Sequence, residues 1–585
     1  MLAWPTSPSI APRLLPVFGW LPNYRREWLA ADAMAGLAIW AVMIPEGMAY
    51  AGIVGVPAIM GLYTIVPPLV AYALFGTSRL LVVGPDTATG LISALTVGAV
   101  VAQGTAAFNV LTSTLAVLIG TLFLLFGALR MGWVAAFIPT PVMRGFIEGL
   151  VCVTIIGQVP HLLGIEGASG NFFARLWSLS QHLPETALAP VLTGLLSLIA
   201  MLLLRGLAPR APAALAVAVA ATILVSLFHG DAAGVPVVGE LPSGLPHPAL
   251  PVLDPLLLWE LLPGGLAIVL VGYAEALGGA KAAAVQDGDD IDPNQELVAH
   301  GPANILSGLF GGFLAVGSLS KTSVAMAAGA RSQLANLIAA LLCFLTLVFL
   351  TPLFRGLPHP ALAAIVIAAM LHLSKPGYLR DLFTRARWEF GVATVVIAGE
   401  LTLGVLHGIA LGVVLSLLLL IYAASHPHGA VLGRLPGTEA YRYVGRHPEA
   451  VTFPGLLIWR LGGDLFFASI GHFEGGLKAA LAASRPPVQH VLLDAESVNF
   501  IDSSACDGLL AFVRKLQSEG LTVAFARVRD SVRERMRDAG IEAAVGPSGF
   551  HDRITDGVRV WLMSQTTDAN LLGSIREAAA ANPPD

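Results

Sequence analysis

The chain has 585 residues, of which 56% are hydrophobic and 12% charged, and its formal net charge at pH 7 is −5. A chain of this length exceeds a single globular core, and so apolar a composition argues against a wholly water-soluble protein. The small net charge carries no information about partners, and we expect no nucleic acid among them.

The N-terminal segment, residues 1–30, lacks the pattern of a cleaved secretory signal, so we expect membrane insertion to rely on the first span. With their weakly polar flanks, most of the apolar segments that follow approach the roughly 20 residues that cross a bilayer. These segments are residues 34–44, 115–129, 195–204, 213–228, 334–350 and 391–424. The last is long enough for two spans, which predicts a helical hairpin.

The loops differ in charge. Arg13, Arg25 and Arg26 precede the first span, whereas the connection over residues 229–264 carries four acidic residues and no lysine or arginine. By the positive-inside rule, both termini are cytoplasmic and the acidic connection is external. The sequence therefore predicts a multi-pass protein of the inner (plasma) membrane, in contact with its lipids.

The membrane part contains a faint internal repeat. A Gly-Leu-Ala-Ile sequence begins at Gly36 and again at Gly265. A glutamate follows each of these glycines by ten positions, Glu46 in the first copy and Glu275 in the second. If each copy holds an odd number of spans, the two halves are inverted relative to one another, an architecture of secondary transporters that bind substrate between the repeats.

Each half also contains a candidate for a short, broken helix. The segment Val83-Gly84-Pro85 and its counterpart Val316-Gly317-Ser318 precede helix-like runs, which leaves backbone N–H groups free at two helix starts. Two opposed helix N-termini can bind an anion without a metal. Ordinary kinks in membrane helices are the alternative interpretation. The predicted substrate-binding residues are Pro85, Asp86, Thr87, Ser318, Leu319, Ser320 and Lys321.

Four charged residues need an explanation in an apolar setting. Lys321 would favour an anion, although it could instead lie at the end of a span and extend to the headgroups. Asp86 would repel an anion if ionised, so we expect it to be protonated, turned away or part of the coupling. Glu46 and Glu275 lie in apolar segments, where a carboxylate is costly unless it is paired, solvated or protonated. We interpret both as candidate coupling-ion residues, with a structural role as the alternative.

Beyond about residue 442 charged residues return, and strand-like and helix-like runs alternate, which predicts a small soluble α/β domain. The domain shows no catalytic constellation, and the three cysteines of the chain show no metal-ligand spacing, so we expect no enzyme, no metal site and no cofactor. The expected organisation is a cytoplasmic segment (1–30), a transport domain (31–425, with repeats of about 31–230 and 262–425), a linker (426–440), the soluble domain (441–566) and a flexible tail (567–585).

Several short motifs are specific as a set. They are Ile44-Pro45-Glu46-Gly47-Met48-Ala49-Tyr50-Ala51, Val83-Gly84-Pro85, residues 139–149, Gln158-Val159-Pro160, Glu275, residues 292–297, Gly311-Gly312-Phe313, residues 317–322 and residues 329–333. On these motifs the chain resembles the sulfate-permease (SulP) family of anion transporters. The resemblance implies fourteen membrane segments in two inverted sevens, a core domain that moves against a gate domain, and a homodimer. It also implies an anion held between the two half-helix starts, and it favours Glu275 as the coupling-ion residue.

Residues 491–494 and 500–504 resemble the domain called STAS, which sulfate transporters share with anti-sigma-factor antagonists. In those antagonists a serine of the matching loop is phosphorylated, so Ser503 or Ser504 could be a regulatory phosphorylation site. The membrane part departs from the family at Lys321, where arginine is usual, and lacks an asparagine that often follows a few positions later. Lysine keeps the charge but loses bidentate recognition of an oxyanion, which leaves bicarbonate or a small dicarboxylate open beside sulfate.

The sequence therefore predicts a polytopic α-helical membrane protein with a small α/β STAS domain, acting as a secondary active transporter of a small anion by alternating access. We expect a proton as the coupling ion, carried by Glu275. Sodium-coupled bicarbonate symport and an uncoupled exchanger or channel are alternatives. Transport of uncharged nucleobases predicts carboxylates and no cation at the helix starts, and a membrane-tethered signalling protein predicts no flux.

Overall fold

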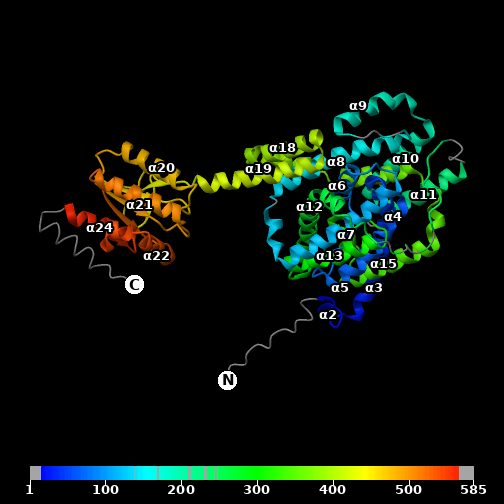
Figure 1. Cartoon of the computed structure of the whole chain (residues 1–585), viewed down its shortest axis with the longest axis horizontal. Coiled ribbons are helices and arrows are strands. Elements are labelled where there is room, and N and C mark those ends of the chain that lie inside the picture. The colour runs from blue at the N-terminus through cyan, green and yellow to red at the C-terminus, as the bar shows by residue number, and fades with distance from the viewer. Residues whose placement is uncertain are drawn as a thin grey trace, which may run out of the picture. The chain divides into compact units, whose positions relative to one another are not determined.

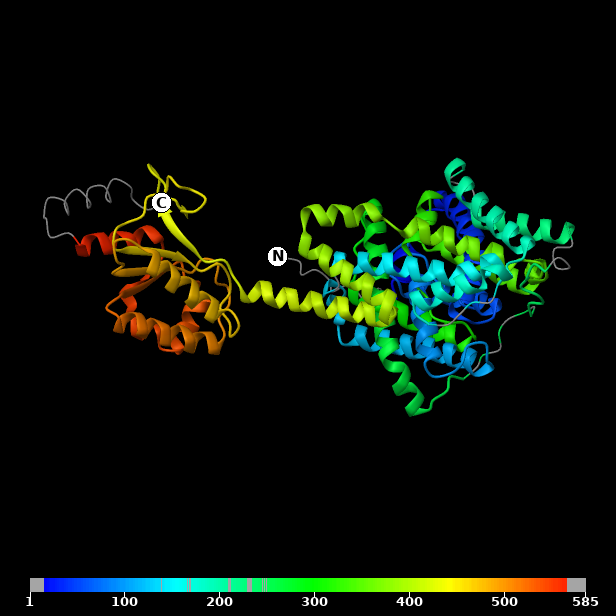
Figure 2. The same cartoon turned by 90° about the horizontal axis from the view of Figure 1, so that it is seen from above.

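The computed structural model describes residues 15–565, apart from 138, 166, 168–169, 209–211, 229–233, 243, 245, 247 and 249. It divides into two compact units, Met1–Ser416 and Leu417–Asp585 (Figures 1 and 2). The expected domain ranges stay predictions, and the tail expected at 567–585 lies outside the described residues.

The first unit is almost entirely helical. Its helices are α2 (Val17–Trp20), α3 (Leu29–Val54), α4 (Ala58–Tyr63), α5 (Val66–Phe75), α6 (Thr87–Gly98), α7 (Ala106–Ala128), α8 (Thr140–Leu163), α9 (Phe172–His182), α10 (Leu188–Leu207), α11 (Ala213–Leu227), α12 (Pro255–Asp287), α13 (Pro293–Leu309), α14 (Leu319–Ala327), α15 (Leu334–Leu345), α16 (His359–Leu373), α17 (Pro376–Arg385), α18 (Arg387–Leu403) and α19 (Val405–Ser425), the last of which continues into the second unit. Two short strands, β1 (Val83–Gly84) and β2 (Val316–Gly317), complete it.

Within the described residues, nine helical segments are long and apolar enough to cross a membrane, and α6 and α11 are shorter apolar helices. With α4 and α5 counted as one segment, and the short α2 and the amphipathic α9 and α17 left aside, the described helices fall into seven segments from α3 to α11 and seven from α12 to α19. This grouping is consistent with two sets of seven spans, although the exact number of spans stays a prediction. The predicted hairpin is confirmed: Gly404, at a φ of 98°, separates α18 from α19, and the two helices pack together, since a Cβ added to Gly399 would lie 3.1 Å from Gly408 Cα.

The two halves meet where their short strands pair. Strands β1 and β2 are antiparallel, with Val83 opposite Gly317 and Gly84 opposite Val316. Helix α6 follows the first strand and α14 follows the second. The two segments that the sequence singled out as broken-helix starts therefore lie side by side in the structure.

Small residues set the spacing of the helices that carry these strands. A Cβ added to Gly120 of α7 would lie 2.6 Å from the carbonyl oxygen of Gly301 in α13, and one added to Gly308 would overlap the carbonyl oxygen of Ser113. Small residues let membrane helices approach until their backbones touch. Close packing of α7 against α13 therefore depends on these glycines.

The second unit is an α/β domain. Its sheet has the strand order β4-β3-β5-β6-β7-β8, in which β5 to β8 are parallel and β3 is antiparallel to both of its neighbours. The strands are β3 (Ala430–Arg434), β4 (Tyr441–Tyr443), β5 (Leu456–Arg460), β6 (His490–Asp494), β7 (Thr522–Ala526) and β8 (Phe550–His551), and the helices are α20 (Ile470–Ala483), α21 (Ser503–Ser518), α22 (Asp530–Asp538), α23 (Ile541–Val545) and α24 (Ile554–Gln565).

Alternation along the strands places a core on each face of this sheet. In β5, Leu457 and Trp459 pack with α20, α21 and α22, whereas Leu456 and Ile458 pack with α24 on the other face. Successive side chains of a strand point to opposite faces, so the four apolar residues of this strand, 456–459, are buried on both sides of the sheet. The alternation of strands and helices predicted from the sequence is confirmed.

Candidate functional site

The candidate site lies where the two broken helices begin. Beyond the β1 and β2 pairing, the amide of Ser318 donates to the carbonyl oxygen of Val82 at 3.0 Å, and the amide of Val82 donates to Thr322 Oγ1 at 3.0 Å. Each half of the molecule thus holds the helix start of the other half in place.

The start of α6 is capped by a carboxylate of the chain itself, that of Asp86. Asp86 has an extended backbone and accepts hydrogen bonds from the amides of Ala88 at 2.9 Å and Thr89 at 3.2 Å. Its carboxylate is an N-cap, which satisfies helix N–H groups that would otherwise lack a partner. Pro85, Asp86 and Thr87 are all buried. Asp86 is therefore turned toward its own helix, one of the arrangements that the sequence left open.

The start of α14 differs. Ser318 has the extended backbone of an N-cap but makes no capping hydrogen bond with its side chain. The next two residues, Leu319 and Ser320, are exposed, whereas Ser318 itself is buried. The first N–H groups of a helix have no partner within the helix, and the positive end of its dipole favours an anion. The first amides of α14 therefore have no side-chain cap and can bind a ligand, whereas two amides of α6 are occupied by Asp86.

Lys321, in the first turn of α14, is buried rather than extended toward a headgroup region; only 2% of its surface is exposed. Its Nζ donates to the carbonyl oxygen of Pro85 at 2.9 Å and lies 3.6 Å from Glu46 Oε2. The same ammonium group lies 5.0 Å from the centre of the Tyr50 ring, within the range of a cation–π interaction. The cation thus belongs to the second half but is held by residues of the first.

The carboxylate of Glu46 in α3 contacts Lys321 and Tyr50. Besides Lys321, its carboxylate accepts a hydrogen bond from the Tyr50 hydroxyl at 3.3 Å, and it is buried. A buried carboxylate needs such compensation. These contacts are compatible with the structural role that the sequence left open for Glu46, and both this role and the coupling role stay predictions.

Glu275 of α12 occupies the corresponding position of the second half and is partly exposed. Its carboxylate lies within electrostatic range of both Asp86 and Lys321. Further along α12, a Cβ added to Gly279 would lie 3.7 Å from the amide nitrogen of Leu319. Glu275 therefore lies on the helix that packs against the start of α14, beside both charged residues of the helix starts.

Three residues that contact this region were not predicted from the sequence: Tyr50, His300 and Asn304. Tyr50 follows Glu46 by one helical turn, and this spacing could have identified it. His300 accepts from the amide of Gly317 at 3.2 Å through its Nε2, and Asn304 bonds both the amide and the carbonyl of Ala315, each at 2.8 Å. These contacts join α13 to β2 over a short stretch of chain, without a motif that predicts them.

No group of three or more histidine, cysteine or acidic side chains that could hold a metal ion occurs among the residues that the structure describes. The donors assembled at the helix starts are amides, hydroxyls and one ammonium group, which suit an anion.

In the STAS unit, Ser503 and Ser504 are exposed and form the first turn of α21, directly after Asp502, whose side chain accepts from the amide of Ala505 at 2.7 Å. A phosphate there would lie at a helix N-terminus, where anions are stabilised. The structure does not test whether Ser503 or Ser504 is phosphorylated, so both serines stay candidates for this modification.

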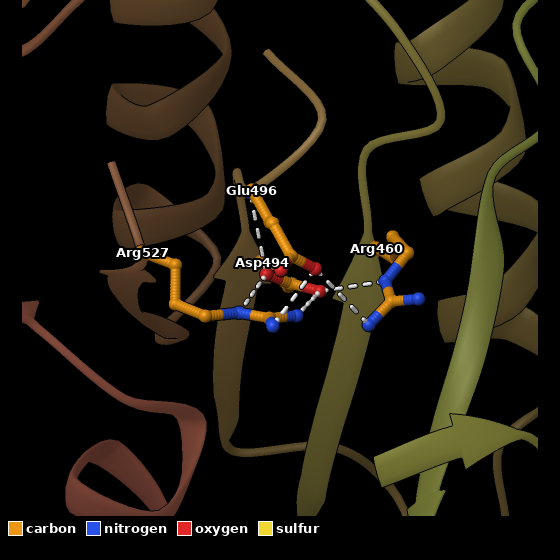
Figure 3. Close-up of polar contacts among 4 residues, drawn as sticks. All are labelled: Arg460, Asp494, Glu496 and Arg527. Atoms are coloured by element: carbon orange, nitrogen blue, oxygen red, sulfur yellow. Dashed lines mark hydrogen bonds and ion pairs between the residues drawn. The ribbon is translucent and has the colours of Figure 1, made fainter. Parts of the chain in front are cut away.

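The same unit contains a buried charge cluster that the sequence did not reveal (Figure 3). Asp494, at the end of β6, is fully buried; it accepts from Arg460 at 2.7 Å and from Arg527 at 2.6 and 2.9 Å. Both arginines also reach toward Glu496, which is half exposed. The paired charges balance, and the cluster joins the ends of β5, β6 and β7.

Taken together, the fold and the paired helix starts define a polytopic membrane protein of the anion-transporter type. A model of the sulfate permease family matches residues 29–396, and a model of the STAS domain matches residues 447–555. The chain belongs to the sulfate permease family and is a multi-pass membrane protein with a C-terminal STAS domain.

Relatives extend over almost the whole chain. A probable sulfate transporter of Mycobacterium tuberculosis is 34% identical over 90% of this chain and 95% of its own length. The chloroplastic sulfate transporter 4.1 of Arabidopsis thaliana is 32% identical over 94% of this chain and 82% of its own length.

Two solved structures share the fold. The murine Solute Carrier 26 family member A9 anion transporter in the inward-facing state has a TM-score of 0.86 and 23% identity, with 95% of each chain covered. The transmembrane domain of a cyanobacterium bicarbonate transporter, BicA, has a TM-score of 0.60 and 23% identity, covering 66% of this chain and 98% of that domain.

Proposed function

We propose that the chain is a secondary active transporter that moves a small anion, of the sulfate, bicarbonate or dicarboxylate class, together with a proton. The anion binds between the starts of α6 and α14, and domain rocking alternates its access to the two sides of the membrane. The chain lies in the plasma membrane with both termini in the cytoplasm. The STAS domain regulates transport or contributes to a homodimer.

One observation supports this proposal above the others. The start of α14 carries no side-chain cap, and Leu319 and Ser320 are exposed there, while Lys321 supplies a positive charge nearby. Free amides and a cation at one helix start favour a small anion over an uncharged nucleobase. In this proposal Pro85, Asp86 and Thr87 supply the opposing side of the site, because the strand before them pairs with the strand before α14; Asp86 caps its own helix.

The proton role falls to Glu275. Glu275 as a residue is partly exposed, and its carboxylate lies within electrostatic range of Asp86 and Lys321. Protonation of Glu275 removes one negative charge beside the anion site, so binding of the proton and binding of the anion favour each other. Relatives named sulfate transporters support sulfate among the proposed substrate classes.

The test is uptake of labelled sulfate, bicarbonate and fumarate into proteoliposomes, with imposed pH or sodium gradients. We expect an inward proton gradient to drive uptake of one of these anions in the wild type, and the drive to disappear in Glu275→Gln. Glu260→Gln is the matched control, because Glu260 lies on the same helix but is exposed, four turns away.

Three outcomes contradict parts of the proposal. Uptake driven only by sodium identifies a sodium-coupled symporter, and uptake that ignores both gradients and the Glu275→Gln change identifies an uncoupled exchanger or channel. No flux of any anion, in a protein that is folded and correctly inserted, leaves the STAS domain as the functional part of a signalling protein.

A further inference from the structure

The first unit contains a cavity of about 700 Å³ that the helix starts do not explain. Helices α3, α6, α8 and α9 line it, at the end of the unit where α3 terminates at Gly55. Leu91 and Leu95 of α6 belong to its wall, and Leu91 lies about one turn from Thr87 at the start of that helix. The cavity is therefore next to the proposed transport site and separate from it.

The wall combines apolar residues with a few polar side chains, as small-molecule sites do. Gln103, Thr154, Gln158 and Arg175 contribute polar groups, and the described lining residues include no acid. Thr154 is 4% exposed, and its hydroxyl has no hydrogen-bond partner among the described residues. A buried hydroxyl without a partner is uncommon in proteins, and a ligand that reaches the Thr154 side chain from the cavity would supply one.

Arg175 of α9 is the residue that gives the cavity its charge. It is partly buried, its Nε donates to the carbonyl oxygen of Gly170 at 3.0 Å, and no carboxylate of the described residues forms an ion pair with it. Its Nη1 lies over α8 at Gly157, where an added Cβ would be 2.9 Å away. The missing side chain at Gly157 therefore makes room for the guanidinium group against the cavity wall.

Helix α9 holds this arginine in place. Asn171 caps the helix through the amide of Ala174 at 2.9 Å and donates to the carbonyl oxygen of Thr402 in α18, also at 2.9 Å. On the other side of α9, Phe173 and Trp177 are exposed. An amphipathic helix with an aromatic face suits a membrane interface. In both views α9 lies at the periphery of its unit (Figures 1 and 2).

We propose that this cavity is a second binding site for a small oxyanion, held by Arg175 with Thr154 and Gln158 as hydrogen-bond donors. The site captures the transported anion before it reaches the starts of α6 and α14. The guanidinium group provides the forked recognition of an oxyanion that Lys321 cannot. The inference rests on the proposed function, since the captured anion is the transported one.

The test compares Arg175→Gln with wild type at a series of concentrations of the labelled anion that the wild type carries. We expect KM to rise by about 3- to 10-fold with kcat unchanged, since a positively lined cleft raises the local concentration of an anion. Arg380→Gln is the matched control, because Arg380 is exposed on α17, the other amphipathic helix. An unchanged KM, or a fall in kcat alone, overturns the proposal.

A binding measurement separates this inference from the proposed function. Equilibrium binding of labelled sulfate to the purified chain should show two sites in wild type and one in Arg175→Gln, provided that the variant keeps the melting temperature of the wild type. Equal site numbers overturn the inference even if transport is normal. The wild type could also take up no anion while Arg175→Gln still loses one binding site. That result would contradict the proposed transport function but support a binding site in the cavity.

A lipid phosphate has the same chemistry as a free oxyanion, and vesicle composition distinguishes the two. Uptake is measured at fixed ionic strength in phosphatidylcholine vesicles with and without phosphatidylglycerol. The proposal predicts the same rise of KM in both. A rise confined to vesicles that contain phosphatidylglycerol identifies a lipid headgroup as the occupant and overturns it.

Discussion

The starts of α6 and α14 follow the same Val-Gly sequence and pair with each other, yet they differ in charge. Asp86 caps α6, whereas Ser318 leaves the first amides of α14 without a side-chain cap. Lys321, from α14, reaches back to Pro85 and Glu46 of the first half. The pairing of the two strands thus places the two helix starts side by side, and the residues that differ between them place the acid in the first half and the donors in the second.

The largest effect is expected from Lys321→Met, which removes the cation and leaves Glu46 buried without its ionic partner. Loss of one partner of a buried ion pair costs about 3–5 kcal/mol. We expect anion uptake to fall to background and the melting temperature to drop. The double variant Lys321→Met with Glu46→Gln should recover much of the stability, but none of the transport. Normal uptake in the single variant contradicts the role of the lysine.

The glycines of the two paired strands, Gly84 in β1 and Gly317 in β2, differ in the space around them. A Cβ at Gly317 would lie 2.9 Å from Ala276 Cβ and 3.0 Å from Ala276 Cα, whereas a Cβ at Gly84 would meet only the end of the Met43 side chain. Overpacking against backbone costs about 1–3 kcal/mol, and methionine adapts more easily. Thermal unfolding should therefore show Gly317→Ala clearly less stable than Gly84→Ala; equal stabilities would mean that the two halves pack alike.

A smaller effect is expected from Asp86→Asn. Asparagine caps a helix about as well as aspartate, so α6 should keep its stability while the negative charge beside the anion disappears. Removal of that charge should lower KM by about five-fold, which corresponds to roughly 1 kcal/mol. Asp86→Ala, which also removes the cap, should lower the melting temperature as well. A higher KM in Asp86→Asn would indicate that the carboxylate helps to bind the substrate.

The sequence predicted the family, the fold class and the position of both broken helices, because glycine and proline at a helix start leave a local signal. It also predicted the α/β character of the STAS domain from the alternation of strand-like and helix-like runs, but it did not predict β3, β4 or β8. The contact of Glu46 with Lys321 joins residues far apart in the chain, and neither residue type indicates its partner. The cluster around Asp494 also joins residues far apart in the chain, so the sequence did not predict it. The contact of Arg175 with Gly157 was not predicted either, because Gly157 is one of many glycines in the sequence.

An anion is proposed to bind at the uncapped start of α14, and Ser318→Asp blocks that position with a carboxylate. The backbone of Ser318 is already extended, as an N-cap requires, so an aspartate there can cap α14 as Asp86 caps α6. Ser318→Asn adds a similar cap without charge and is the matched control. The measurement is the uptake of labelled anion by both variants at equal folded protein.

We expect Ser318→Asp to keep the melting temperature of the wild type and to lose at least about ten-fold in uptake, because its carboxylate occupies the place of the substrate. Ser318→Asn should retain measurable transport with a higher KM. If Ser318→Asp transports as well as the wild type, the anion does not bind at the start of α14, and the proposed transport site is wrong.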